Sequence, residues 1–345
     1  MKKTFCILLA AFVLGVLLVQ AFDRYLNSEN VFWEEAVQRS HSWASRLEKD
    51  YPSKYVVAGG SSSRTSIDPK LLLDEYGIPL VISSLPAGFG LSVNVAGAAP
   101  YLKRGDTLIL CLEPRMLAIS TSKKKASTTN GEKFFTHHLR SPHSEEFFDL
   151  TLSDAARILR GHSYQILVRS VRHFVGKTPY RYAPVELSPA GWLQVSTKFP
   201  LSSNRCDLAH RMSNLLPTPW AEQYLGRIAA WGKRNGVKVI YALPRILWSD
   251  NSRVYHAAVA LRLMEIMPVL KDRALGTDDD ASHFSDSINH SSEEGAELMT
   301  REWARALSSD DFWTREELLD YIHSRGWNED GTPREKNETA GVRQP

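Results

Sequence analysis

The chain contains few cysteines and has no strong excess of charge of either sign. Three cysteines in 345 residues exclude a disulfide-rich scaffold. A bond between Cys111 and Cys206 is one reading, but buried thiols of this kind are more often core residues, so we predict no disulfide framework. A formal net charge of +3 gives no electrostatic footprint for nucleic acid, and no helix-turn-helix, zinc-finger or base-stacking motif is present.

Residue spacings typical of a metal site are also missing. His137, His138 and His143 form a cluster of histidines, for which we favour a polar surface over a metal site. We therefore predict no metal and no other cofactor. The hydrophobic content of 43% is sufficient for one large core with insertions.

An apolar run early in the chain passes into a turn of small residues. Residues 55–58 have the length and composition of a buried strand, and Gly59-Gly60 allow a sharp turn that a Cβ would resist. Asp68 and Pro69 then mark the start of a helix. Ser61 is thus expected at the carboxyl end of a strand, where open α/β sheets bind ligands. A plain structural turn is the alternative.

A second polar stretch lies late in the chain. Asp286 precedes His290, and Ser291 with Glu294 forms a capping box that starts a helix running to Leu307. An Asp a few residues before a His can hold the imidazole in one tautomer, which leaves the other ring nitrogen to accept a serine proton. A solvated loop histidine is the alternative.

Together the two stretches resemble the SGNH, or GDSL-like, hydrolase superfamily. Gly59-Gly60-Ser61 stands where that superfamily has Gly-Asp-Ser, and Asp286 with His290, followed by Gly295, is similar to its closing Asp-x-x-His block. Within the superfamily, the chain is most similar to a membrane-anchored branch linked to O-acylation of cell-surface polymers. The segments that carry this second similarity are 85–91 and 100–114, and the whole resemblance covers 52–115 and 237–309.

The resemblance implies specific roles for these residues. Ser61 would be the nucleophile, His290 its general base and Asp286 the partner of the histidine. The amides of Ser61 and Gly88 would form the oxyanion hole.

The sequence departs from the superfamily pattern at three places. The Asp286 to His290 spacing is one residue longer than usual, and a literal Asp-x-x-His occurs instead at Asp280 and His283, although no capped helix follows it at the right distance. The Asn that normally donates to the oxyanion is missing, because the third strand ends in Leu112-Glu113-Pro114. The neighbours Ser62 and Ser63 are alternative nucleophiles.

The N-terminal end has the pattern of a membrane segment. Lys2-Lys3 precede an uncharged apolar stretch at 4–22 that has the length of a transmembrane helix, with a cleavable signal segment as the alternative. We therefore expect the rest of the chain outside the cytoplasm, anchored to the inner membrane. The predicted parts are a membrane segment at 1–22, a helical stalk at 23–50, an SGNH-like domain at 51–310 with a large insertion at about 115–218, and a polar extension at 311–345.

Strand and helix patterns alternate through the predicted domain. Further strands are expected at 79–84, 106–112 and 236–244, with helices at 92–102 and 219–235. This alternation predicts a three-layer α/β/α (flavodoxin-like) fold with a parallel sheet.

The insertion mixes aromatic and cationic residues. Such a mixture binds an anionic sugar polymer or a lipid headgroup, or else forms a subdomain with an aromatic core and solvated charges. The residues concerned are Phe134, Phe135, His138, Arg140, Phe147, Phe148, Arg169, Arg172, His173, Tyr180, Arg181 and Tyr182.

The function that we predict is serine-dependent acyl transfer, as an O-acetyltransferase or an esterase, on a cell-surface polysaccharide or a related acyl-sugar. A multi-spanning membrane-bound O-acyltransferase is the expected acyl supplier, as the resemblance implies. The competing hypothesis is a degenerate, noncatalytic partner that binds polymer or organises a membrane complex.

Overall fold

The computed structural model describes residues 28–122, 127–139, 141–148, 182–194, 216–247, 252–329 and 332–334, together with scattered positions between 4 and 18. Sequence predictions that involve Cys206, the greater part of the insertion and the tail after residue 334 lie outside these residues. So do the side chains of His137, His138 and His143.

Four parallel strands form the central sheet, in the order β2-β1-β3-β4. β1 (Tyr55–Gly59) lies between β2 (Leu80–Ile82) and β3 (Thr107–Cys111), and β4 (Lys238–Tyr241) pairs with the outer side of β3. Their Val, Ile and Leu content is that of strands buried on both faces. The α/β class and the parallel sheet agree with the sequence analysis.

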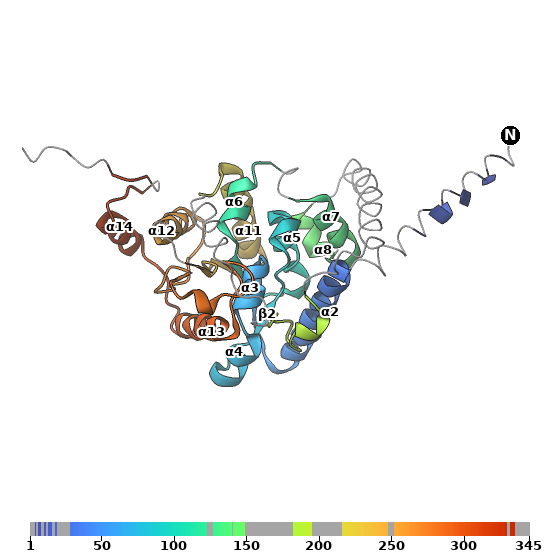
Figure 1. Cartoon of the computed structure of the whole chain (residues 1–345), viewed down its shortest axis with the longest axis horizontal. Helices are drawn as coiled ribbons and strands as arrows, with labels where there is room; N and C mark the ends of the chain where they lie inside the picture. The colour runs from blue at the N-terminus through green and yellow to red at the C-terminus, as the bar shows by residue number, and fades with distance from the viewer. Residues whose placement is uncertain are drawn as a thin grey trace, which may run out of the picture.

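One face of the sheet is covered by α2 (Ser28–Asp50), α5 (Leu91–Ala96) and α11 (Pro219–Asn235) (Figure 1). Val56 and Leu108 point into this layer and are fully buried. Because side chains alternate along a strand, the next residue of each strand faces the opposite layer.

The opposite face is covered by α4 (Pro69–Tyr76) and α13 (Glu293–Ser308). Val57 and Ile109 point into this second layer, which also contains Trp303 of α13. Helices therefore cover both faces of the sheet, and the carboxyl ends of the four strands share one edge between the two layers.

The remaining described elements lie outside the four-stranded sheet, and β5 (Ile246–Leu247) and β6 (Thr277–Asp278) among them pair as a separate two-stranded parallel sheet. These remaining elements are α3 (Ser61–Ser66), η1 (Ala87–Phe89), η2 (Ala99–Tyr101), α6 (Pro114–Ile119), α7 (Thr129–Phe134), η3 (Phe135–Leu139), α8 (Pro142–Phe147), η4 (Pro184–Glu186), β5 (Ile246–Leu247), α12 (Ser252–Leu263), β6 (Thr277–Asp278), η5 (Ala281–His283) and α14 (Arg315–Ser324).

Local capping signals set the helix ends. Asp68 accepts hydrogen bonds from the first free N–H groups of α4, and Gly77 ends that helix in the left-handed conformation with φ of 66°. In α13 the cap is Ser292 rather than the predicted Ser291. The Ser291 hydroxyl instead forms a hydrogen bond with the Ser66 hydroxyl, 2.7 Å away.

The prediction of an N-terminal transmembrane helix is wrong. Within the part of the chain that the structure describes, no helix is both long enough and apolar enough to span a bilayer. Of the described helices only α2, with 23 residues, has the length that a span needs, and charged residues such as Glu35 and Arg39 interrupt it.

Candidate functional site

Ser61 lies where β1 passes into α3. Gly60 precedes it with φ of −78° and ψ of −174°, which is extended backbone that any residue adopts. The glycines are required for space: a Cβ on Gly59 would collide with the Cys111 carbonyl oxygen, and one on Gly60 would collide with the Glu113 carboxyl group. Close approach of β3, rather than a special turn conformation, therefore explains both glycines.

His290 contacts Ser61 directly. The distance from the Ser61 Oγ to the His290 Nε2 is 2.8 Å, and the distance from the His290 Nδ1 to the Asp286 Oδ1 is also 2.8 Å. The side chain of Asp286 is 1% exposed and that of His290 is 12% exposed. The structure thus brings together the three predicted triad residues, from segments 229 positions apart in the sequence.

A closed turn explains the longer spacing between Asp286 and His290. The Ser285 N–H donates to the His290 carbonyl at 2.9 Å, and the His290 N–H donates to the Ser287 carbonyl at 3.2 Å. The extra residue is absorbed in this turn, which returns the imidazole to the carboxylate four positions earlier.

Tyr182 completes the hydrogen-bonding around the histidine. Its hydroxyl donates to the Asp286 Oδ2 at 2.6 Å and lies 2.9 Å from the His290 Nδ1. Because the hydroxyl hydrogen points to the carboxylate, the Tyr182 oxygen presents only lone pairs to the ring, so the Nδ1 carries the proton. In the neutral imidazole with this tautomer, Nε2 is the acceptor for the Ser61 hydroxyl proton.

The segment that carries Tyr182 is fixed to α3 through Arg64. This side chain is fully buried, and its guanidinium donates to the Ser84 carbonyl at 2.7 Å and the Gly191 carbonyl at 2.5 Å. Burial lowers the pKa of Arg64 to about 10. The Trp192 indole N–H also donates to the Thr65 carbonyl at 3.0 Å. The 182–194 segment is therefore attached to α3 by hydrogen bonds in both directions.

The two predicted oxyanion donors lie beside the nucleophile. A Cβ added to Gly60 would lie 3.3 Å from the Ala87 Cβ. Ala87 is the first residue of η1, so η1, which also contains Gly88, borders the turn that carries Ser61. Among the described residues, neither the Ser61 N–H nor the Gly88 N–H has a hydrogen-bond acceptor. Both amides are therefore available to a developing negative charge.

Glu113 occupies the neighbouring position at the end of β3. Glu113 lies two residues after Cys111, the β3 partner of Gly59, and its carboxyl group lies against Gly60. Its side chain accepts a hydrogen bond from the Ser62 N–H at 3.5 Å. The residue is 7% exposed. A carboxylate accepts hydrogen bonds only, so it cannot replace the donor that the superfamily pattern expects here.

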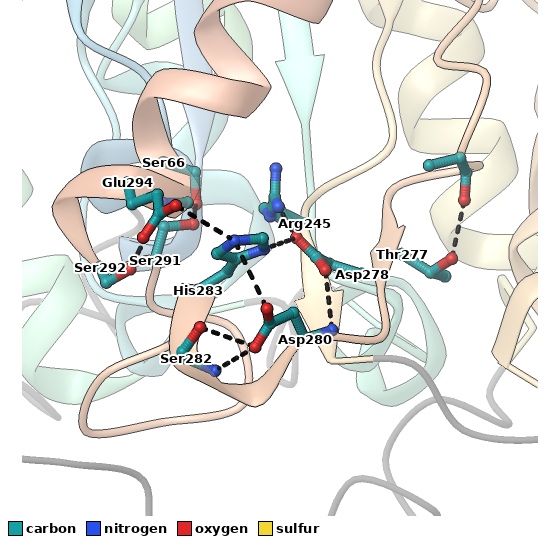
Figure 2. Close-up of polar contacts among 12 residues, drawn as sticks. Ser66, Arg245, Thr277, Asp278, Asp280, Ser282, His283, Ser291, Ser292 and Glu294 are labelled. Atoms are coloured by element: carbon teal, nitrogen blue, oxygen red, sulfur yellow. Dashed lines mark hydrogen bonds and ion pairs between the residues drawn. The ribbon is translucent and has the colours of Figure 1, made fainter.

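The alternative residues make other contacts (Figure 2). The His283 Nδ1 lies 2.8 Å from the Asp278 Oδ2. Asp280 caps η5 through Ser282, and its Oδ2 lies 3.8 Å from the His283 Nε2. Asp278 also forms an ion pair with Arg245. Figure 2 shows His283 within this polar cluster.

Neither alternative serine contacts a histidine among the described residues. The buried Ser62 hydroxyl has no hydrogen-bond partner there, and the Ser63 hydroxyl donates to the Gly60 carbonyl at 2.9 Å. In the same part of the chain, no group of three or more His, Cys, Asp or Glu side chains is arranged to hold a metal ion.

The roles of Tyr182 and Arg64 at the site are not evident from the sequence. Tyr182 belongs to the aromatic and cationic residues of the insertion, and nothing in its neighbourhood in the sequence connects it with His290, 108 positions away. Arg64 follows the nucleophile by three residues, but its burial is not evident from an arginine in a polar run.

Comparison with protein families and with curated proteins identifies no relative of this chain. No protein-family model matches the sequence, and no curated protein matches it either. Membership of the SGNH superfamily therefore remains a prediction from the motifs.

Proposed function

We propose that the protein is a serine-dependent acyl-transfer enzyme that acts on an acylated saccharide or polysaccharide. The observation that carries the proposal is the continuous hydrogen-bonded chain from the Ser61 hydroxyl through the His290 imidazole to the Asp286 carboxylate. A serine hydroxyl becomes an effective nucleophile when a correctly oriented base takes its proton during attack.

In the first half-reaction, the Ser61 Oγ attacks the carbonyl carbon of an acyl ester. His290 takes the hydroxyl proton on Nε2, and Asp286 stabilises the resulting imidazolium. The negative charge on the former carbonyl oxygen is met by the Ser61 and Gly88 amides. Collapse of this intermediate breaks the bond to the donor alcohol, which leaves with the proton from Nε2.

In the second half-reaction, another hydroxyl takes the acyl group from Ser61. His290 removes the proton of the incoming hydroxyl, and the Ser61 oxygen recovers a proton from Nε2 when the ester bond breaks. A sugar hydroxyl makes the reaction an O-acyl transfer, and water makes it an ester hydrolysis. The polymer acceptor, the membrane-bound acyl supplier and a location outside the cytoplasm stay predictions from the sequence resemblance.

A fluorophosphonate probe tests the proposal. This probe reacts preferentially with activated serines, and intact mass with peptide mapping identifies the modified residue. We expect one adduct on Ser61 in the wild-type chain and none in Ser61→Ala. His290→Ala should reduce the labelling rate by at least about 10³-fold, because the hydroxyl loses its base.

Ser62→Ala is the matched control. It removes a neighbouring hydroxyl that has no partner among the described residues, so both folding and labelling should be preserved. A folded wild-type chain that acquires no adduct would contradict the proposal.

One observation favours a second candidate, the noncatalytic partner. Glu113 places a carboxylate beside Ser61 where a donor is expected, which opposes negative charge at the oxyanion. The same experiment separates the two functions, since a binding partner needs no activated serine.

A further inference from the structure

A cavity of about 280 Å³ lies between α8 and α11, with Ser92 of α5 in its wall. Its aromatic floor and its polar rim both come mainly from α11. The wall is connected along the chain to the proposed oxyanion segment, because α5 starts at Leu91, one residue after η1, which contains Gly88.

The floor of the cavity is a pair of stacked aromatic rings. Trp220 and Tyr224 are one helical turn apart on α11, with ring centroids 5.3 Å apart and an interplanar angle of 9°. Tyr224 is 3% exposed, and its hydroxyl donates to the Phe147 carbonyl at 3.1 Å. Trp220 is half-buried, so its indole is the exposed member of the stack, and the Tyr224 ring against it supports the indole without a ligand.

The rim of the cavity is polar and includes one positively and one negatively charged side chain. Gln223 and Arg227 are also one turn apart on α11, and both are exposed. The Arg227 guanidinium lies 5.4 Å from the centroid of the Tyr224 ring. Glu146 of α8, also exposed, lines the same cavity. Among the described lining residues, the rim thus contains amide, guanidinium and carboxylate groups, with one charge of each sign.

We propose that this cavity binds a neutral pyranose unit of the acceptor polymer. A pyranose ring has an apolar C–H face that stacks on a flat aromatic surface, and hydroxyls around its edge that need donors and acceptors. The volume is of the size that one or two sugar rings fill, and the rim charges of opposite sign favour an uncharged ring. The acceptor role rests on the proposed function, whereas the binding of a saccharide does not.

Isothermal titration calorimetry on full-length Ser61→Ala tests the binding without turnover. The probes are hexasaccharides of β-1,4-linked glucose and of β-1,4-linked N-acetylglucosamine, with a uronate hexasaccharide as the charged comparison. We expect at least one neutral hexasaccharide to bind more tightly than the uronate. Adding Trp220→Ala should weaken that binding roughly tenfold, since the stacking surface is lost.

Two variants keep the test specific. Trp220→Phe preserves a flat ring and should bind within about threefold of the parent. Trp327→Ala removes another half-buried tryptophan, which packs on Tyr255 outside the cavity, and should leave the affinity unchanged. The melting temperature of each variant excludes misfolding as the cause of a loss.

Binding of neither neutral hexasaccharide, tighter binding of the uronate, or an affinity that survives Trp220→Ala would overturn the inference. The outcome is separable from the proposed function. Saccharide binding that depends on Trp220, without a fluorophosphonate adduct on Ser61, would support the saccharide site and contradict the proposed enzyme function. An adduct on Ser61 without saccharide binding would support the enzyme function and contradict the saccharide site.

Discussion

Substitution Tyr182→Phe removes one hydroxyl from the centre of the proposed triad and leaves the ring. The ring centroid lies 5.8 Å from that of Phe32 and 6.2 Å from that of His290, and the residue is 7% exposed, so a phenylalanine keeps the same packing. The change removes the hydrogen bond to the Asp286 Oδ2 and the contact with the His290 Nδ1.

The size of the effect follows from the kind of hydrogen bond. At 2.6 Å between a hydroxyl and a buried carboxylate, the bond is of the charge-assisted type, which contributes about 1.5–3 kcal/mol. If about 1.4 kcal/mol of this is lost from the transition state through a less fixed imidazole, the rate falls about tenfold. The remainder should appear as a lower free energy of unfolding.

The assay combines three readouts on one protein preparation. They are kcat/KM for p-nitrophenyl acetate, the rate of fluorophosphonate labelling of Ser61, and the free energy of unfolding in urea. Tyr101→Phe is the matched control, because Tyr101 is 4% exposed and its hydroxyl makes a 3.4 Å contact with the Val37 carbonyl, away from the triad. We expect both rates to fall about tenfold in Tyr182→Phe and to stay near wild type in Tyr101→Phe.

A result in which the two variants have equal kcat/KM and equal labelling rates would refute the reasoning. A drop in the unfolding free energy alone would show that Tyr182 supports the fold without orienting His290.

Glu113→Gln exchanges a carboxylate, which only accepts hydrogen bonds, for an amide that also donates. We therefore expect kcat/KM for p-nitrophenyl acetate to rise about tenfold. An unchanged or lower value would argue against an effect of Glu113 on the oxyanion. His283→Ala should keep the wild-type labelling rate of Ser61, and a loss as large as that of His290→Ala would instead assign the base to His283. Burial lowers the pKa of His256 to about 4, below its ordinary value of 6.5, so its contribution to stability is complete above pH 6.5 and is lost as the pH falls toward 4. The loss should reach about 3 kcal/mol in urea unfolding, and His256→Asn, which keeps a donor for the Leu275 carbonyl, should lack this part of the acid dependence.

Local sequence signals were sufficient for much of the fold. Asp68, Pro69 and Gly77 define α4 because capping depends on residues within one turn of the helix end. The strand positions followed from short apolar runs, although the strands themselves are shorter than the runs, as in β2 (Leu80–Ile82) within 79–84. The apolar stretch at 4–22 shows the limit of such patterns, since no spanning helix is found among the described residues.

Motif spacing alone would have selected a histidine other than the one that contacts Ser61. Asp280 and His283 fit the literal Asp-x-x-His pattern, yet the histidine that reaches Ser61 is His290. The turn closed by the Ser285 N–H and the His290 carbonyl sets the position of the ring, and a count of intervening residues does not capture that geometry. The helix that follows His290 was the more reliable signal.

Tyr182 and Glu113 required the three-dimensional structure for different reasons. Tyr182 reaches Asp286 across 104 positions, and a single tyrosine in a mixed segment has no periodicity that reveals its partner. Glu113 was visible as a departure from the expected Asn, but its relation to Ser61 depends on the register of β1 against β3, in which Gly59 pairs with Cys111. Long-range pairing and strand register are both properties of the folded chain.

These two residues have opposite effects on the proposed chemistry. In the proposed reaction, Tyr182 and Asp286 would orient His290 to activate Ser61, whereas Glu113 would disfavour the charge that develops when an acyl group is attacked. The same penalty applies to attack by water on an acylated Ser61, so hydrolysis of the acyl-enzyme is slowed together with its formation. A bound acceptor offsets the penalty with binding energy that water does not have. A carboxylate at this position is thus better suited to transfer onto a bound hydroxyl than to hydrolysis.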